Sequence, residues 1–168
     1  VDTLVEHPRH GWLVTNPSLS PENGHPFGTS VCAGPTMDSQ ILRDLFANCI
    51  KASEILNTDA DLRQKLVATS ARLAPNQIGK GGQLQEWLED WDMTAPERQH
   101  RHVSHLYAVY PSAQLANGTT PALTAAARRS LDLRGDESTG WATAWRAALW
   151  TRLRDPERAY TLIAFLLS

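Results

Sequence analysis

The sequence has few cysteines and no long apolar run, and each of these absences excludes a class of protein. Its 168 residues include two cysteines, Cys32 and Cys49. Two cysteines at this separation are too few for a disulfide framework or a cysteine-based zinc site, and they leave the redox compartment open. No stretch reaches the roughly 20 apolar residues of a membrane-spanning helix. The sequence therefore predicts no membrane insertion.

Neither sign of charge dominates the chain. Sixteen Lys and Arg stand against 18 Asp and Glu, which gives a net charge of −2. A protein that binds nucleic acid or an anionic membrane surface usually carries a clear positive excess. We therefore expect neither of these as a partner.

Phenylalanine and tyrosine are also scarce, with three of each, whereas tryptophan occurs six times. Tryptophan often lines carbohydrate sites because the indole ring stacks on the C–H face of a sugar, although large cores use tryptophan as well. The composition is therefore compatible with a carbohydrate ligand and with a purely structural use.

Both ends of the chain look cut. Val1 begins the sequence without a methionine or a signal-peptide pattern, and an apolar run over residues 162–167 continues almost to Ser168 without a helix cap. We expect the chain to be a fragment of a longer protein, and the isolated fragment to be inactive.

Helical periodicity accounts for most of the chain after residue 35. Apolar residues recur at spacings of three and four from Met37 to Leu56, which predicts a helix with Thr36 as its N-cap and a break at Asn57. Further helical segments are expected over residues 59–74, 83–88 (a short helix or turn), 102–110, 120–133, 140–154 and from 155 onward. Residues 1–34 show one short strand near 12–15 and no hairpin signal. The predicted fold class is mainly α, with long loops that are more often functional than accidental.

The loop over residues 15–23 presents one carboxylate, Glu22, between prolines. Pro17 and Pro21 lack a backbone N–H and hold the residues before them extended, and the Ser, Thr and Asn side chains bond locally to the backbone. A general acid needs such a setting, because burial raises the pKa of a carboxyl group and packing fixes its direction. A solvated surface turn is the alternative.

Glycines at 79, 81 and 82 begin a second candidate loop. No Gly-Lys-Ser or Gly-Lys-Thr follows them, so the phosphate-loop pattern is not met. Gln83, Gln85 and Trp87 beside these glycines are consistent with a loop that contacts a sugar.

Three histidines, His100, His102 and His105, form a third cluster. They lack the i, i+4 spacing and the supporting acidic residue of a zinc-binding helix, and Arg101 would add positive charge beside a metal ion. We therefore expect no metal site. Arg101 and His102 are instead expected to hydrogen-bond a polar ligand, and His105 to be a satisfied core histidine.

Asp136 lies on a glycine-flanked turn that precedes a predicted helix. It could cap that helix, or it could join Glu22 as the second of the two carboxylates that glycoside hydrolysis requires. Arg134 is close to it in sequence, whereas no Lys or Arg lies near Glu22. These neighbours predict an ionised Asp136 and a neutral Glu22, the usual division between base and acid.

Six motifs, taken in order, resemble glycoside hydrolase family 95, which is best known for α-L-fucosidases acting on α-1,2 linkages. They are residues 16–23 (NPSLSPEN), 34–38 (GPTMD), 77–79 (QIG), 82–87 (GQLQEW), 100–107 (HRHVSHLY) and 134–136 with 139–141 (RGD and TGW). The match runs through nearly the whole chain. It implies an (α/α)6 toroid, of which residues 1–168 would form about the C-terminal half.

Carried over residue by residue, the resemblance implies that Glu22 is the general acid, Asp136 the general base, and Arg101 with His102 a sugar-contacting pair. It implies no metal and no organic cofactor. The expected substrate is a glycan or oligosaccharide with terminal α-1,2-linked L-fucose, cleaved with inversion. The sequence leaves the location unknown, and the resemblance is compatible with a secreted or periplasmic one.

Two departures from the family pattern stand out. Glu137 and Ser138 replace glycines after the aspartate, and Ala142 replaces a serine after the tryptophan. The family also holds the attacking water with an asparagine pair that has no equivalent here, so the missing N-terminal half of the domain is an expected partner. Two rival functions remain: an α-L-galactosidase, because a methyl and a hydroxymethyl group differ by only about 1–3 kcal/mol of binding, and a non-catalytic helical carbohydrate-binding or scaffold protein.

Overall fold

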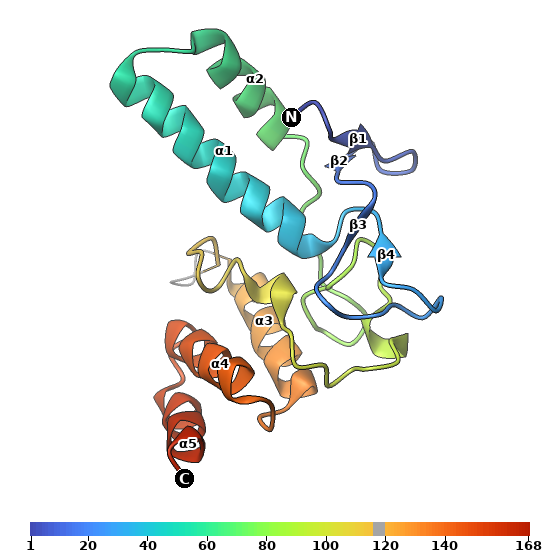
Figure 1. Ribbon diagram of the computed structural model, residues 1–168, viewed down its shortest axis with the longest axis vertical. Coiled ribbons are helices and arrows are strands. Elements are labelled where there is room, and N and C mark those ends of the chain that lie inside the picture. Colours follow the sequence, from blue (N-terminus) through green and yellow to red (C-terminus); the bar gives the residue numbers. More distant parts are fainter. Residues whose placement is uncertain (116–119) are drawn as a thin grey trace.

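The computed structural model describes residues 1–115 and 120–168, and most of its regular structure is helical (Figure 1). Within these ranges there are five α-helices: α1 (Thr36–Leu56), α2 (Ala60–Ser70), α3 (Pro121–Arg134), α4 (Gly140–Arg152) and α5 (Pro156–Leu166). Two short 3-10 helices lie between α2 and α3, at Asp92–Thr94 and Ser104–Leu106. The prediction of a mainly α fold is confirmed.

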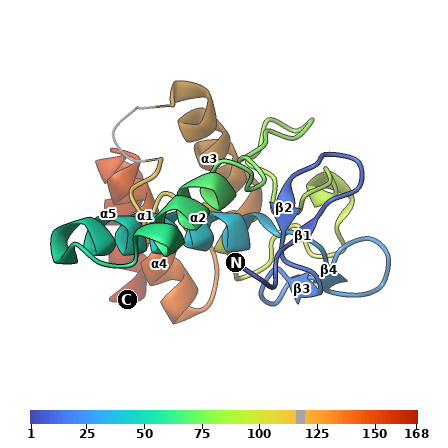
Figure 2. The same ribbon diagram turned by 90° about the horizontal axis from the view of Figure 1, so that it is seen from above.

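Four two-residue strands form two antiparallel pairs near the N-terminus. Strand β1 (Val5–Glu6) pairs with β2 (Leu13–Val14), and β3 (Ser18–Leu19) pairs with β4 (Val31–Cys32). Seen from above, both pairs lie on one side of the molecule and the α-helices on the other (Figure 2). Only the strand near residue 13 was predicted, because a two-residue ladder is too short to show alternation.

Helices α1 and α2 pack side by side around Phe46, Leu66 and Leu73 (Figure 1). The predicted break at Asn57 is confirmed, since this residue caps α1 in the left-handed conformation with φ 50°. Thr36 is the first helical residue rather than the N-cap, and its hydroxyl donates to the carbonyl oxygen of Gln85 at 2.7 Å. Helix α2 ends at Ser70, before Pro75 is reached.

A larger core joins α3, α4 and α5 to the segment after Val103. Its fully buried members include Leu106, Leu131 and Leu149. The predicted starts of α3 and α5, near residues 120 and 155, are confirmed. Pro121 and Pro156 each open a helix, and the Asp155 side chain accepts a bond from the Arg158 backbone N–H at 3.1 Å. No helix in the described part of the chain is long and apolar enough to cross a membrane.

The predicted helix over residues 102–110 is wrong: this segment forms one 3-10 turn followed by tight turns. Gln40 on α1 explains the difference. Its amide donates to the carbonyl oxygen of His105 at 2.8 Å and accepts from the backbone N–H of Ala108 at 2.9 Å. Backbone groups that a helix would pair internally are therefore satisfied by a side chain from another element. Residues 83–88, expected as a short helix or a turn, form bends and no helix.

Candidate active site

Glu22 lies on the loop that follows β3, and its carboxylate forms an ion pair with the guanidinium of Arg101. His102 Nε2 lies 3.5 Å from the same carboxylate oxygen. The fold therefore brings three of the four predicted site residues together. Glu22 has no Lys or Arg near it in sequence, but Arg101, 79 positions away, reaches its loop through the tertiary fold.

Buried hydrogen bonds hold the backbone of the loop around Glu22, while the Glu22 side chain itself remains 61% exposed. Ser20 and Asn23 are fully buried, and they donate to the two carboxylate oxygens of Glu86 at 2.7 and 3.0 Å. Ser104 adds a bond to the carbonyl oxygen of Pro21 at 2.8 Å. Glu22 thus projects from a backbone held on both sides, so its direction is set by buried bonds.

The His102 ring contacts two other rings. It stacks on His100 with centroids 5.3 Å apart, and it contacts Trp141, at the start of α4, at 4.7 Å. Burial lowers the pKa of His102, and the negative charges of Glu22 and Glu86 oppose this only in part. His102 is therefore largely neutral at pH 7 and can donate or accept one hydrogen bond.

Asp136 follows the C-terminus of α3, where Gly135 turns the chain with φ 76°. Its carboxylate accepts two bonds from Arg158 on α5, from Nε at 3.2 Å and from Nη2 at 3.0 Å. The predicted capping role is wrong, because Thr139 occupies the N-cap position of α4. The expected partner is also corrected, since Arg158 rather than Arg134 meets Asp136.

Arg158 is itself held firmly. Its guanidinium stacks over the Trp150 ring at 4.5 Å from the centroid and also bonds Asp132 at 2.8 Å. The hydrogen bond to Asp136 raises the pKa of Arg158 above its ordinary value. The cation beside Asp136 is therefore permanent, and stacking limits the directions from which it can bind the carboxylate.

Arg134 instead forms a buried ion pair with Glu86. Burial alone would raise the pKa of Glu86, but the charge of Arg134 and the bonds from Ser20 and Asn23 outweigh it and hold that pKa below the ordinary value. Glu86 is fully buried and ionised, and it touches the Glu22 loop on one side and the end of α3 on the other. The sequence contained Glu86 within a quoted motif, but no pattern pointed to this role.

Arg146, fully buried on α4, links two other parts of the site. Its Nη1 donates to the carbonyl oxygen of Gly135 at 2.9 Å, and its Nη2 donates to that of His100 at 3.1 Å. The turn that carries Asp136 and the segment that carries Arg101 and His102 therefore share one guanidinium. Neither Arg146 nor Arg158 was identified from the sequence, because their partners lie on other elements.

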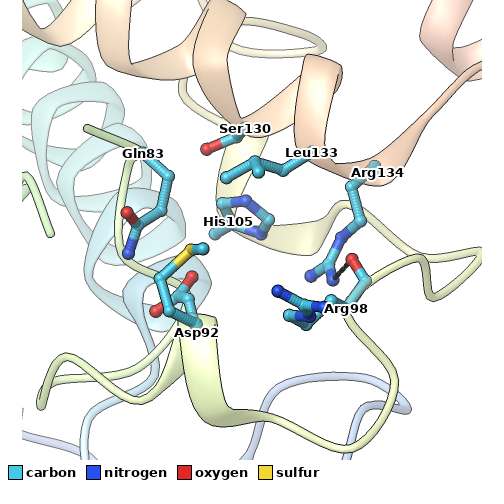
Figure 3. A pocket seen from close by; sticks show the side chains of 8 residues that line it. Gln83, Asp92, Arg98, His105, Ser130, Leu133 and Arg134 are labelled. Carbon is cyan, nitrogen blue, oxygen red and sulfur yellow. Dashed lines mark hydrogen bonds between the residues drawn. The ribbon is translucent and has the colours of Figure 1, made fainter. Parts of the chain in front are cut away.

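A small cavity lies beside the C-terminal end of α3 (Figure 3). Its volume is about 20 Å³, and it is lined by Gln83, Asp92, Met93, Arg98, His105, Ser130, Leu133 and Arg134. Such a space holds about one water molecule and cannot hold a sugar. An open hollow of about 340 Å³ lies instead at the Asp136 turn, lined by Gln99, Arg134, Gly135, Asp136 and Glu137.

His105 and Asp92 both line the small cavity, and burial shifts their pKa values in opposite directions. Burial lowers the pKa of His105 to about 4 and raises that of Asp92 to about 7, with the negative charge of Glu86 adding to the second shift. His105 is in the core as predicted, but it is not satisfied, because its Nδ1 has no bonding partner in the described structure. Within residues 1–115 and 120–168, no group of three or more His, Cys, Asp or Glu is placed to hold a metal ion.

The family comparison and the similar known sequences all point to one family of enzymes. The family described as the glycosyl hydrolase family 95 catalytic domain matches residues 1–168. The chain is 42% identical to "Alpha-L-fucosidase 2" of Arabidopsis thaliana over 171 residues, which cover 99% of this chain and 20% of that protein. It is 34% identical to "Probable alpha-fucosidase A" of Aspergillus niger over 164 residues, 93% of this chain and 20% of the relative. The protein of the same name from Aspergillus oryzae is also 34% identical, over 89% of this chain and 22% of its own length. The chain thus spans about a fifth of the length of these relatives.

Proposed function

Because the chain belongs to glycoside hydrolase family 95, we propose that it forms part of the catalytic domain of an inverting α-L-fucosidase and contributes its general acid and general base. The substrate is a glycan or oligosaccharide with a terminal α-1,2-linked L-fucose. The observation that carries this proposal is the convergence of Glu22 with the adjacent pair Arg101 and His102, which lies 79 positions further along the chain and meets Glu22 at the surface.

In the proposed reaction Glu22, in its neutral form, transfers a proton to the glycosidic oxygen while the bond to the anomeric carbon breaks. Asp136, ionised, removes a proton from a water molecule that attacks the opposite face of the sugar. Arg101 and His102 hydrogen-bond the sugar hydroxyls. The proton balance closes, because Asp136 ends the reaction protonated and Glu22 ends it ionised.

The Glu22 carboxylate is paired with the Arg101 guanidinium, so this pair has to open before Glu22 can meet the glycosidic oxygen. Both side chains are substantially exposed, at 61% for Glu22 and 43% for Arg101. Exposed ion pairs contribute only about 0–1 kcal/mol, so opening this one costs little. We propose that the sugar takes Arg101 as its own hydrogen-bond partner and excludes water from Glu22.

Helices α1 to α5 belong, in this proposal, to an (α/α)6 toroid, and residues 1–168 are its C-terminal portion. The rest of the domain supplies the asparagine pair that holds the attacking water beside Asp136. The hollow at the Asp136 turn supports this arrangement, since it leaves the base open to solvent.

The direct test uses the full-length protein with α-1,2-fucosyl and α-L-galactosyl oligosaccharides. We expect hydrolysis of the fucoside to be faster, and Glu22→Gln to lower its kcat by about 10²–10⁴-fold. Glu89→Gln is the matched control, because it breaks a surface ion pair, with Arg9, that also joins distant segments. Equal activity of the Glu22 and Glu89 variants would refute the role of Glu22, and faster hydrolysis of the galactoside would refute the substrate.

A further inference from the structure

Glu86 occupies a buried position between the two predicted catalytic segments. Its carboxylate accepts hydrogen bonds from Ser20 and Asn23, the residues two before and one after Glu22. The same carboxylate pairs with Arg134, two residues before Asp136. One side chain thus contacts both the loop of the acid and the last residue of α3, which leads into the turn of the base, although it reaches neither Glu22 nor Asp136 itself.

The backbone of Glu86 is equally well anchored. Its carbonyl oxygen accepts a bond from Thr36 N–H at 3.1 Å, at the start of α1, and its own N–H donates to Asp92 Oδ1 at 3.0 Å. Arg134 is fixed in turn by a bond from Nη1 to the carbonyl oxygen of Arg98 at 2.8 Å. Neither end of the ion pair can shift without breaking several other bonds.

We propose that Glu86 is a positioning residue, which fixes the Glu22 loop relative to the Asp136 turn through its bonds to Ser20, Asn23 and Arg134. This inference rests on the proposed function, because it assumes that Glu22 and Asp136 act on one substrate.

A purely stabilising role explains this arrangement less well. Removing a carboxylate and a guanidinium from water is expensive, and apolar side chains of similar volume usually stabilise a core as well or better. The network around Glu86 offers what apolar packing lacks, which is directional bonds to two separate loops. Small displacements of catalytic groups are costly, since a shift of about 1 Å can lower a rate by about 10²-fold.

The test compares two substrates in the full-length protein: a fucosyl oligosaccharide, whose leaving group needs protonation, and an activated aryl fucoside, whose leaving group does not. Ser20→Ala loosens only the acid loop, so we expect kcat to fall about tenfold further for the oligosaccharide than for the aryl fucoside. Arg134→Met loosens the turn of the base, which both substrates need, so we expect equal losses. Glu86→Gln should combine both effects, with KM changed much less than kcat.

An unpaired buried charge can unfold a protein, so the double variant Glu86→Gln/Arg134→Met, which removes both charges, accompanies the single ones. We expect it to regain thermal stability relative to Glu86→Gln and yet keep the low kcat. Arg43→Met is the structural control. It removes a half-buried guanidinium that bonds the carbonyl oxygen of Ala74 at 2.5 Å, away from the site, and should lower the melting temperature without favouring either substrate.

Glu22→Gln serves as the reference for a damaged acid. If it lowers the two rates equally, the proposed function is wrong and the inference falls with it. If Glu22→Gln separates the substrates but Ser20→Ala and the double variant behave like Arg43→Met, the inference about Glu86 is overturned while the proposed function stands.

Discussion

The guanidinium of Arg158 meets both carboxylate oxygens of Asp136, with Nε 3.2 Å from Oδ2 and Nη2 3.0 Å from Oδ1. Two parallel bonds fix the plane of the carboxylate as well as its position. The residue proposed as the general base is therefore oriented by a helix, α5, that carries none of the predicted site residues.

Arg158→Met should lower kcat by roughly 10–100-fold, since Asp136 loses the partner that directs it. Steady-state kinetics with an oligosaccharide and with an aryl fucoside should show equal losses, because both substrates need the water that Asp136 activates, whatever their leaving group. Arg128→Met is a matched control: Arg128 also lies over the Trp150 ring, at 5.8 Å, but pairs with Asp155. A loss confined to the oligosaccharide would contradict the assignment of Asp136 as base.

The buried carboxyl of Asp92 should make stability depend on pH. Its pKa is raised to about 7 from an ordinary value of 3.8, so the folded state holds a proton that the unfolded state has lost between these values. The free energy of unfolding therefore falls as pH rises from about 4 to 7. His105, with its pKa lowered to about 4 from 6.5, acts oppositely up to pH 6.5 and masks much of this fall.

Asp92→Asn removes the contribution of Asp92 to the pH dependence of stability, and it keeps an oxygen that can accept the bond from the Glu86 backbone N–H. We expect the variant to equal the parent near pH 3.5 and to exceed it by roughly 2–4 kcal/mol at pH 8. Denaturant unfolding of the full-length protein at several pH values measures the difference. A difference that is constant with pH would show that Asp92 is not protonated in the folded state.

Local signals allowed the helices to be predicted, whereas long-range pairing did not show in the sequence. Asn57 and the pair Asp155-Pro156 mark helix ends through their own backbone preferences, so α1 and α5 could be predicted. The segment over residues 102–110 could not, because Gln40 on another element satisfies its backbone.

In the candidate site, too, local motifs could be recognised in the sequence, whereas pairing between distant residues could not. Glu22, Arg101 and His102 follow from motifs that lie along the chain, and the fold brings them together. The partners of Asp136 and Arg134 do not follow from sequence neighbours, because Arg134 pairs across 48 positions with Glu86. Proximity in sequence suggested an Arg134–Asp136 pair that the structure replaces with Arg158.

Residues 1–168, expressed alone, should associate and show no fucosidase activity. Apolar side chains are exposed on α1 and α5, among them Leu45, Ile55, Tyr160 and Phe165. Large exposed apolar surfaces drive association, and the proposed asparagine pair would be absent. Light scattering after size-exclusion chromatography, with an activity assay on each fraction, tests both points. A monomeric and fully active preparation would contradict them.

The configuration of the first released sugar tests the central claim most directly. If Glu22 is the acid and Asp136 the base, a water molecule must fit between the base and the anomeric carbon, which calls for carboxyl groups roughly 6.5–9.5 Å apart rather than about 5–5.5 Å. Proton NMR of the full-length protein acting on an α-linked fucoside should show the β-sugar first, followed by mutarotation. Appearance of the α-sugar before mutarotation would contradict the assignment of these two roles.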